Sequence, residues 1–177
     1  MKYGIGVLCL SLIGIVTGCG QEQSAPVETA GSETVQAVDG AQFLLTVEPD
    51  GAGDVISVRK DAKDAEEIVI VGRIGGSRNP WIKGRAAFSI VDPSLRACSD
   101  IPGDKCKFPW DYCCETDKLP AAMVLVKFVD EQGNVVKADA RELLELKELQ
   151  TVVIRGKAQR DEEGNLTVLA SGLFVKE

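Results

Sequence analysis

The sequence predicts a mainly β domain, a small closed barrel of five strands with one short helix. The first observation is a series of short apolar runs rich in valine and isoleucine, separated by turns that contain glycine, asparagine or proline. The second is composition, because 45% hydrophobic residues suffice for a core, and 18 glycines with 5% aromatics favour strands and turns. The third is the order of segments, which runs strand, strand, insertion, strand, helix, strand, strand. A chain of 177 residues accommodates one domain with appendages.

The individual elements follow from local patterns. The run at 68–74 reads IVIVGRI and is broken by Gly72, a usual sign of a strand that bends sharply. Asp139, with Glu142 three residues later, has the spacing of a helix capping box, and leucines follow as far as Leu149. The predicted strands are 68–74, 87–91, 123–129, 151–156 and 166–175, with a cysteine-rich insertion between the second and third and the helix between the third and fourth.

This order of elements resembles the OB-fold, a five-stranded Greek-key barrel with a helix between the third and fourth strands. The V-x-V-G-x-I pattern at 69–74 and the final L-x-V-x-A strand from Leu166 resemble OB domains of the nucleic-acid-binding type, over residues 68–175. An open β-sandwich and an SH3-like barrel are the alternatives. The resemblance implies bends at Gly72 and Gly156. The apolar residues expected to face inward are Val69, Val71, Phe88, Ile90, Leu125, Val153 and Val168.

The first nineteen residues have the pattern of an export and acylation signal. A positive start at Lys2 precedes an apolar run at 5–16, which is too short to span a hydrocarbon core roughly 30 Å thick. The run ends in Val-Thr-Gly-Cys, which resembles the lipobox of bacterial lipoproteins and implies that Cys19 carries lipid. The alternative is an ordinary cleaved signal peptide with an incidental Cys19. Because Gly20 is not the aspartate that marks inner-membrane retention, we expect an extracytoplasmic protein anchored on the periplasmic side of the outer membrane.

Charge divides the chain near residue 67. Residues 20–67 contain eleven acidic and three basic side chains, whereas residues 68–177 contain sixteen of each. The acidic segment argues against docking on anionic lipid or nucleic acid through that part of the chain. The predicted organisation is a leader at 1–18, a flexible acidic tether at 19–40, an N-terminal extension at 41–67, and a barrel domain at 68–177 that carries the insertion at 92–121.

Four of the six cysteines lie in the insertion with the spacing C-x7-C-x6-C-C, at Cys98, Cys106, Cys113 and Cys114. An exported protein meets oxidising conditions, so two disulfides are expected. Strained geometry disfavours a bond between adjacent cysteines, which pairs Cys98 and Cys106 each with one of the other two. One alternative is a thiolate site for zinc or copper, although the paired C-x-x-C pattern of such sites is absent. The other is a redox role for the adjacent pair.

Basic and aromatic side chains indicate two candidate ligand-binding loops. Basic residues surround Trp81, with no acid between 68 and 91, and an OB-fold uses such side chains to track phosphates and to stack bases. The alternative is that Trp81 packs against the barrel. In the insertion, Trp110 and Tyr112 are suited either to packing or to stacking on a ligand. The candidate ligand-binding residues are Arg73, Arg78, Trp81, Lys83, Arg85, Trp110 and Tyr112.

The chain contains no histidine, which removes Ser-His-Asp and Cys-His catalysis and His-containing zinc sites. We therefore expect no catalytic residues and no enzymatic activity. The leading hypothesis is a lipid-anchored binding module of the cell envelope, whose partners are the membrane and an envelope protein, a glycan or a small ligand. The alternatives are a thiolate metal-binding or redox protein, with zinc or copper as the cofactor, and single-stranded nucleic-acid binding through the OB-like face. The extracytoplasmic address and the balanced charge of the domain disfavour nucleic acid.

Overall fold

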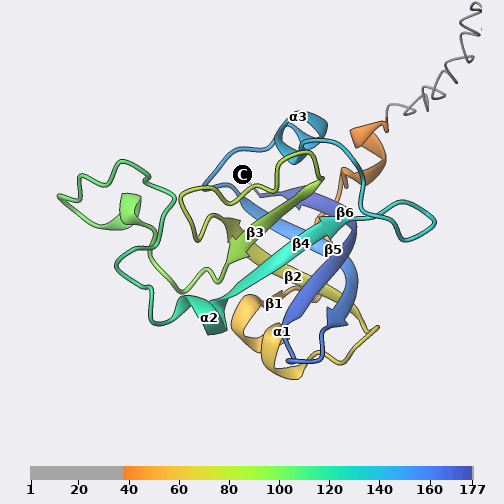
Figure 1. The fold of residues 1–177 in the computed structure, drawn as a ribbon, viewed down its shortest axis with the longest axis horizontal. Coiled ribbons are helices and arrows are strands. Elements are labelled where there is room, and N and C mark those ends of the chain that lie inside the picture. Colours follow the sequence, from red (N-terminus) through yellow and green to blue (C-terminus); the bar gives the residue numbers. More distant parts are fainter. Residues whose placement is uncertain (1–37, 177) are drawn as a thin grey trace, which may run out of the picture. The chain divides into compact units, whose positions relative to one another are not determined.

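The computed structural model describes residues 38–176, and its centre is a closed barrel of five strands (Figure 1). β2 pairs with β3, β3 with β4, β4 with β6 and β6 with β5, and β5 returns to β2. All of these pairs are antiparallel except β4 with β6. The strands are β2 (Glu67–Ile74), β3 (Ala87–Val91), β4 (Met123–Phe128), β5 (Thr151–Arg160) and β6 (Leu166–Val175). This Greek-key order is that of the OB-fold, and it confirms the predicted fold class.

Short elements surround the barrel. α3 (Ala140–Leu144) lies between β4 and β5, as predicted, and the Asp139 carboxylate accepts a hydrogen bond from the Arg141 amide at 3.1 Å. The helix is shorter than its leucine pattern indicates, because Glu145 has a φ of 53° and ends it. The remaining elements are η1 (Gly40–Phe43), β1 (Gly53–Asp54), α1 (Val55–Asp61), η2 (Cys98–Asp100) and α2 (Leu119–Ala122). The predicted leader, Cys19 and most of the tether lie outside the described residues.

The bend expected at Gly156, in the fourth strand of the barrel, is confirmed. The register of β5 against β6 shifts between Arg155 and Gly156. A Cβ at Gly156 would lie 2.3 Å from the Leu169 carbonyl oxygen, so the two strands approach too closely for any other residue. Gly72 is buried in β2, where a Cβ would come within 2.9 Å of the Ile90 side chain.

The main core fills the barrel, and it corrects part of the predicted inward face. Phe88, Ile90 and Val168 belong to this core and are fully buried, as predicted. Val153 is fully buried too, but it pairs with Val71 on the outer face of the barrel and does not belong to this core, so its predicted inward orientation was wrong. The prediction was wrong for Val69, Val71 and Leu125, which are half-buried on the outer face. β2 and β4 instead bury the alternate residues Ile68, Ile70, Ile74, Val124, Val126 and Phe128. A strand has a side-chain period of two, so a shift of one residue exchanges its faces.

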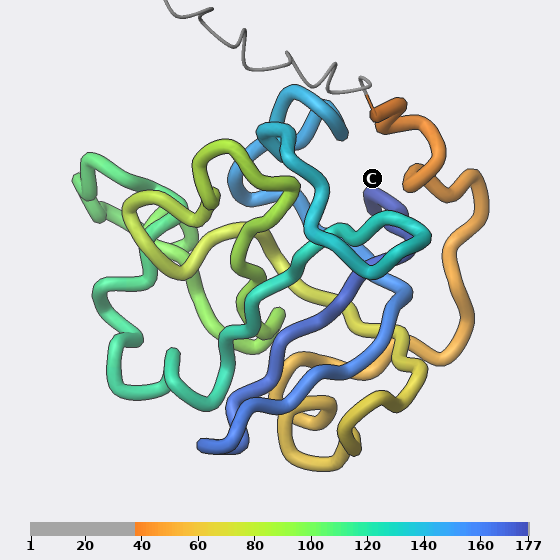
Figure 2. The backbone as a smooth tube through the Cα atoms, turned by 45° about the vertical axis from the view of Figure 1, so that its right-hand side comes forward, coloured from red at the N-terminus to blue at the C-terminus, as the bar shows by residue number. Residues whose placement is uncertain are grey.

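The cysteine insertion leaves the barrel between β3 and β4, as predicted, and Figure 2 shows it as the green segment to one side of the barrel. A second, smaller core lies where the insertion meets the barrel. It contains Val91, Leu95, Ala97, Tyr112 and Ala122. Within the part of the chain that the structure describes, no helix has the length and apolarity that a membrane span requires.

Candidate thiol site in the cysteine insertion

The two ends of the insertion close around a buried carboxylate. Asp92 is 2% exposed, and its amide donates to the Ala122 carbonyl oxygen at 2.8 Å. Its Oδ1 accepts from the amide and the hydroxyl of Ser94, at 2.9 and 2.6 Å. Its Oδ2 accepts from the Ile56 amide in α1 at 2.9 Å. Because both carboxylate oxygens are satisfied, the base of the insertion is firmly held.

Backbone hydrogen bonds then hold the two arms of the insertion together. The Cys98 amide donates to the Asp111 carbonyl oxygen at 2.9 Å, and the Ser99 amide donates to that of Pro109 at 3.0 Å. The chain therefore returns on itself before Cys113. This return places two cysteines that are 15 positions apart in direct contact.

The insertion is also fixed to the barrel. The Arg73 Nη1 atom in β2 lies 2.5 Å from the Asp100 Oδ2 atom, and Arg73 Nε donates to the Leu149 carbonyl oxygen at 3.1 Å. The hydrogen bond from Arg73 lowers the pKa of Asp100, although partial burial opposes the shift. The Gly76 amide donates to the Trp110 carbonyl oxygen at 3.2 Å. Arg73, a candidate ligand-binding residue, thus holds the insertion in place.

Three sulfur atoms converge at the centre of this framework. The ligand atoms of Cys98, Cys106 and Cys113 all lie within 4.8 Å of one another. Cys98 is buried, Cys106 is half-buried and Cys113 is exposed, so the group runs from the interior to the surface. The Cys106 amide donates to Asp104 Oδ1 at 2.9 Å, and its thiol contacts the Phe108 carbonyl oxygen at 3.4 Å. Cys114 is exposed and does not belong to the group of three.

The disulfides expected from the spacing are not formed among the described residues. Cys98, Cys106, Cys113 and Cys114 are all free thiols. The Sγ atoms of Cys98 and Cys113 are 3.3 Å apart, whereas a disulfide bond is about 2.05 Å long. Cys98, Cys106 and Cys113 come together without bonding, because the backbone hydrogen bonds between the two arms of the insertion bring them close.

The surroundings favour the protonated thiols. Burial raises the pKa of Cys98 to about 12, and the neighbouring Cys113 thiol adds to the shift. For Cys113, the hydrogen bond with Cys98 lowers the pKa, but desolvation and the adjacent Cys114 and Cys106 thiols outweigh it, so the pKa is raised. Any metal ion that binds these sulfurs must therefore displace protons.

Tyr112 packs in the small core where the insertion meets the barrel. Its side chain is fully buried, and its hydroxyl has no hydrogen-bond partner among the described residues. Burial raises the pKa of Tyr112 to about 12, although the Arg73 charge opposes the shift. Tyr112 was a candidate for stacking on a ligand, but a fully buried ring has no free face to offer.

Because its buried hydroxyl lacks a protein partner, Tyr112→Phe is expected to keep the free energy of unfolding unchanged or to raise it by about 1 kcal/mol at neutral pH. The unfolded tyrosine ionises near pH 10 and the folded one at about 12, so the wild type loses stability between these values as the pH rises. Phenylalanine does not ionise, so the free energy of unfolding of the variant should not show this loss between pH 10 and pH 12. Urea unfolding of both proteins from pH 7 to pH 11 checks it. A loss of more than about 1 kcal/mol at pH 7 would show that the hydroxyl is bonded.

The other candidate ligand-binding residues do not form one surface. Trp81 is 4% exposed, its Nε1 donates to Glu148 Oε1 at 2.8 Å, and its ring lies 5.5 Å from that of Phe88. Trp81 is therefore a core residue. Lys83 and Arg85 are exposed on the loop that follows it.

Arg78 and Trp110 do come together, around an aromatic ring that the sequence analysis missed. The Arg78 guanidinium lies 5.8 Å from the centre of the Phe108 ring, and the Lys107 ammonium lies 5.7 Å from it. The Trp110 ring packs edge-on against Phe108 at 6.0 Å, and its Nε1 donates to the Arg78 carbonyl oxygen at 3.2 Å. The signal that could have identified Phe108 is its place beside Pro109 and Trp110 in an insertion otherwise poor in apolar residues.

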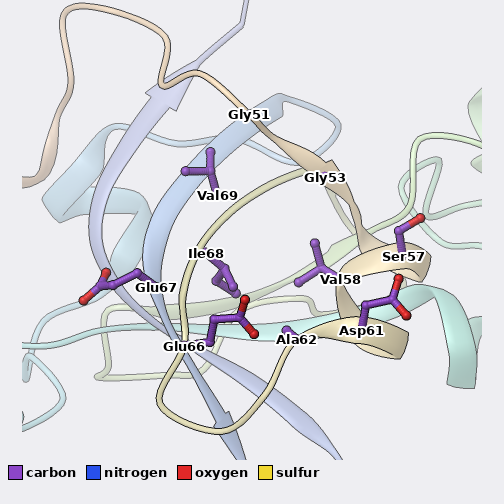
Figure 3. Close-up of a pocket in the computed structure, with 10 residues that line it drawn as sticks. All are labelled: Gly51, Gly53, Ser57, Val58, Asp61, Ala62, Glu66, Glu67, Ile68 and Val69. Carbon is purple, nitrogen blue, oxygen red and sulfur yellow. The ribbon is translucent and has the colours of Figure 1, made fainter.

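A cavity of about 310 Å³ lies between α1 and the start of β2 (Figure 3). Three acids line it, but two have partners: the Glu66 carboxylate accepts from the Lys63 amide at 2.7 Å, and Glu67 lies 3.4 Å from the Lys157 ammonium. Figure 3 shows the Glu67 side chain directed away from Asp61. This cavity offers no convergent set of ligand atoms, so the sulfur cluster is the better candidate site.

Comparisons with known proteins add little to this description. No protein-family model matches the sequence, and no curated protein matches it. Among solved structures, the chain is similar to the mitochondrial single-stranded DNA binding protein Rim1 of S. cerevisiae, with 14% identity over 65% of this chain and 98% of that one, at a TM-score of 0.35. A likeness at this level carries no argument about function, and the barrel is identified from its own strand pairing.

Proposed function

We propose that this protein is a lipid-anchored, extracytoplasmic binding module that holds a thiophilic metal ion in its cysteine insertion. The observation that supports the proposal is the convergence of three sulfur ligand atoms within 4.8 Å of one another. A metal–thiolate bond is about 2.3 Å long, so sulfurs that share one ion lie roughly 3.7 to 4.0 Å apart. The Cys98 and Cys113 sulfurs are 3.3 Å apart and no pair exceeds 4.8 Å, so small side-chain rotations would bring all three sulfurs to one ion. Thiolates select soft metals such as Cu(I) and Zn²⁺.

The framework around the sulfurs supports a binding role. The backbone ladder between the arms, the Arg73–Asp100 ion pair and the buried Asp92 carboxylate hold the cluster in place. Such a preformed site avoids part of the ordering cost of binding. The bound ion would supply a fixed positive charge against three thiolates, while the protein positions them and excludes water from Cys98.

The test of this proposal is metal binding by the purified full chain, reduced under argon. With Cu(I) or Zn²⁺ added, we expect one equivalent to bind and the thiols of Cys98, Cys106 and Cys113 to be protected from alkylation. Cys114 is the internal control, because it is exposed and lies outside the group of three. Equal alkylation of all four thiols with and without either metal would contradict the proposal.

The lipid anchor is the second part of the proposal, and it is supported by the pattern that ends at Cys19. A diacyl chain contributes about 0.8 kcal/mol for each buried CH₂, enough to hold the protein stably at a membrane. Cys19→Ser is therefore expected to move the protein from the membrane fraction to the soluble fraction, and to abolish incorporation of labelled fatty acid. Cys9→Ser is the matched control, and it should leave both unchanged. Equal lipid labelling of the Cys19→Ser variant would contradict the anchor.

Single-stranded nucleic acid is the alternative ligand, and one observation favours it. Arg78, Lys107, Phe108 and Trp110 form a cluster of basic and aromatic side chains beside the barrel, the combination that binds phosphates and stacks bases. Titration with labelled single-stranded DNA at 50 and 200 mM salt tests it. Binding that weakens steeply with salt and is lost in Arg78→Ala would establish this function.

A further inference from the structure

We infer that the ion is monovalent copper, held by the three sulfurs of Cys98, Cys106 and Cys113 alone. This inference rests on the proposed function and names the ion of that site. Its basis is the number and kind of ligand atoms that the fold brings together, and the depth at which they lie.

The number of ligands is three. Among the described residues, no carboxylate and no fourth sulfur joins the group whose ligand atoms lie within 4.8 Å of one another. The sequence contains no histidine that could complete a tetrahedron. Structural zinc sites use four protein ligands, whereas Cu(I) is satisfied by two or three thiolates. A three-sulfur site therefore fits Cu(I) better than Zn²⁺.

Three aspartates of the insertion, each two positions from one of the three cysteines, already have partners. Asp100 pairs with Arg73 at 2.5 Å, and the Asp104 carboxylate accepts the Cys106 amide at 2.9 Å. The Asp111 carboxylate accepts the Tyr112 amide at 2.8 Å. None of these carboxylates belongs to the group of ligand atoms within 4.8 Å of one another, so the described site offers soft donors only.

The depth of the cluster suits an ion that must be shielded from water. Cys98 is 1% exposed, while Cys113 reaches the surface. The ion would enter past Cys113 and move inward to Cys98. Each Cu(I)–sulfur bond replaces a thiol proton, which leaves to solvent, and neither copper nor sulfur changes oxidation state.

The experiment compares the full chain with two variants, using Cu(I) itself in competition with a colorimetric Cu(I) chelator, and Zn²⁺ in parallel. Cys106→Ser removes a predicted ligand, and Cys114→Ser removes the neighbouring thiol outside the group. We expect the Cu(I) affinity of Cys114→Ser to stay within about threefold of the wild type, and that of Cys106→Ser to fall more than about a hundredfold. X-ray absorption of the Cu(I)-loaded wild type should count three sulfurs.

The outcomes separate the two claims. A count of four sulfurs, or a loss of tenfold or more in Cys114→Ser, would show a four-thiolate site and overturn the copper assignment while leaving metal binding in place. Binding of Zn²⁺ without binding of Cu(I) would also overturn the copper assignment and leave metal binding in place. If neither ion binds, the proposed function itself fails.

Discussion

Cys98→Ser is expected to reduce the affinity of the protein for a thiophilic metal ion by more than about a hundredfold. A structural metal site of four ligands contributes about 12 kcal/mol at neutral pH, or about 3 kcal/mol for each ligand, which is a factor of more than a hundred. Cys98 is the most buried of the three clustered cysteines, with 1% of its surface exposed. Its loss therefore leaves the two sulfurs that are more open to solvent.

The measurement is competition with a metal chelator of known affinity, on wild type and variant in the same buffer. Serine is nearly isosteric with cysteine, and the Cys98 backbone amide keeps its bond to Asp111, so the variant should retain the circular dichroism spectrum of the wild type. Ser99→Ala is the matched control beside it, and it should bind metal normally. Unchanged affinity in Cys98→Ser, with the fold intact, would remove Cys98 from the site.

Trp81→Ala is expected to lower the free energy of unfolding by about 3 to 5 kcal/mol, the cost of truncating a large aromatic residue in a core. Trp81 is 4% exposed, and its ring packs against Phe88. The Arg141 guanidinium lies 5.5 Å from the centre of the Trp81 ring, and the Trp81 indole N–H donates to the Glu148 carboxylate. Truncation would therefore leave a cavity and an unpaired acceptor together.

Urea denaturation monitored by circular dichroism measures this effect, with Trp110→Ala as the matched control. Trp110 is only half-buried and lies within the insertion, where its ring packs against Phe108, so its truncation should cost less than that of Trp81. The comparison also tests the assignment of Trp81 to the core. A Trp81→Ala variant as stable as the wild type would instead favour an exposed, ligand-facing tryptophan.

The strand order could be predicted from the sequence, but which alternate residues of β2, β4 and β5 face the core could not. The runs in β2 and β4 are apolar at nearly every position, and such runs do not show which alternate residues face the core. Val69, Val71 and Leu125 were assigned inward, yet they are half-buried on the outer face. Arg73 and Lys127 carried the missing signal, since each shares a face with these residues and belongs on the outside.

The candidate site was only partly predictable. Cysteine spacing marked the insertion, but spacing alone does not distinguish a disulfide framework from a metal site, because that depends on the path of the loop. Two hydrogen bonds that set this path are not revealed by any residue pattern. The Cys98 amide donates to the Asp111 carbonyl oxygen, and the Ile56 amide donates to the Asp92 carboxylate. The hydrogen bond between Trp81 and Glu148 joins residues 67 positions apart, so it could not be predicted from the sequence either.

The most direct measurement is the intact mass of the protein, isolated from cells without reductant or chelator and measured by native mass spectrometry. A protein that uses its cysteine insertion to hold a metal should carry one bound ion. After acid replaces that ion with protons, the mass should show all four insertion cysteines as thiols. A protein without metal, lighter by the hydrogens lost in two disulfides, would contradict this function.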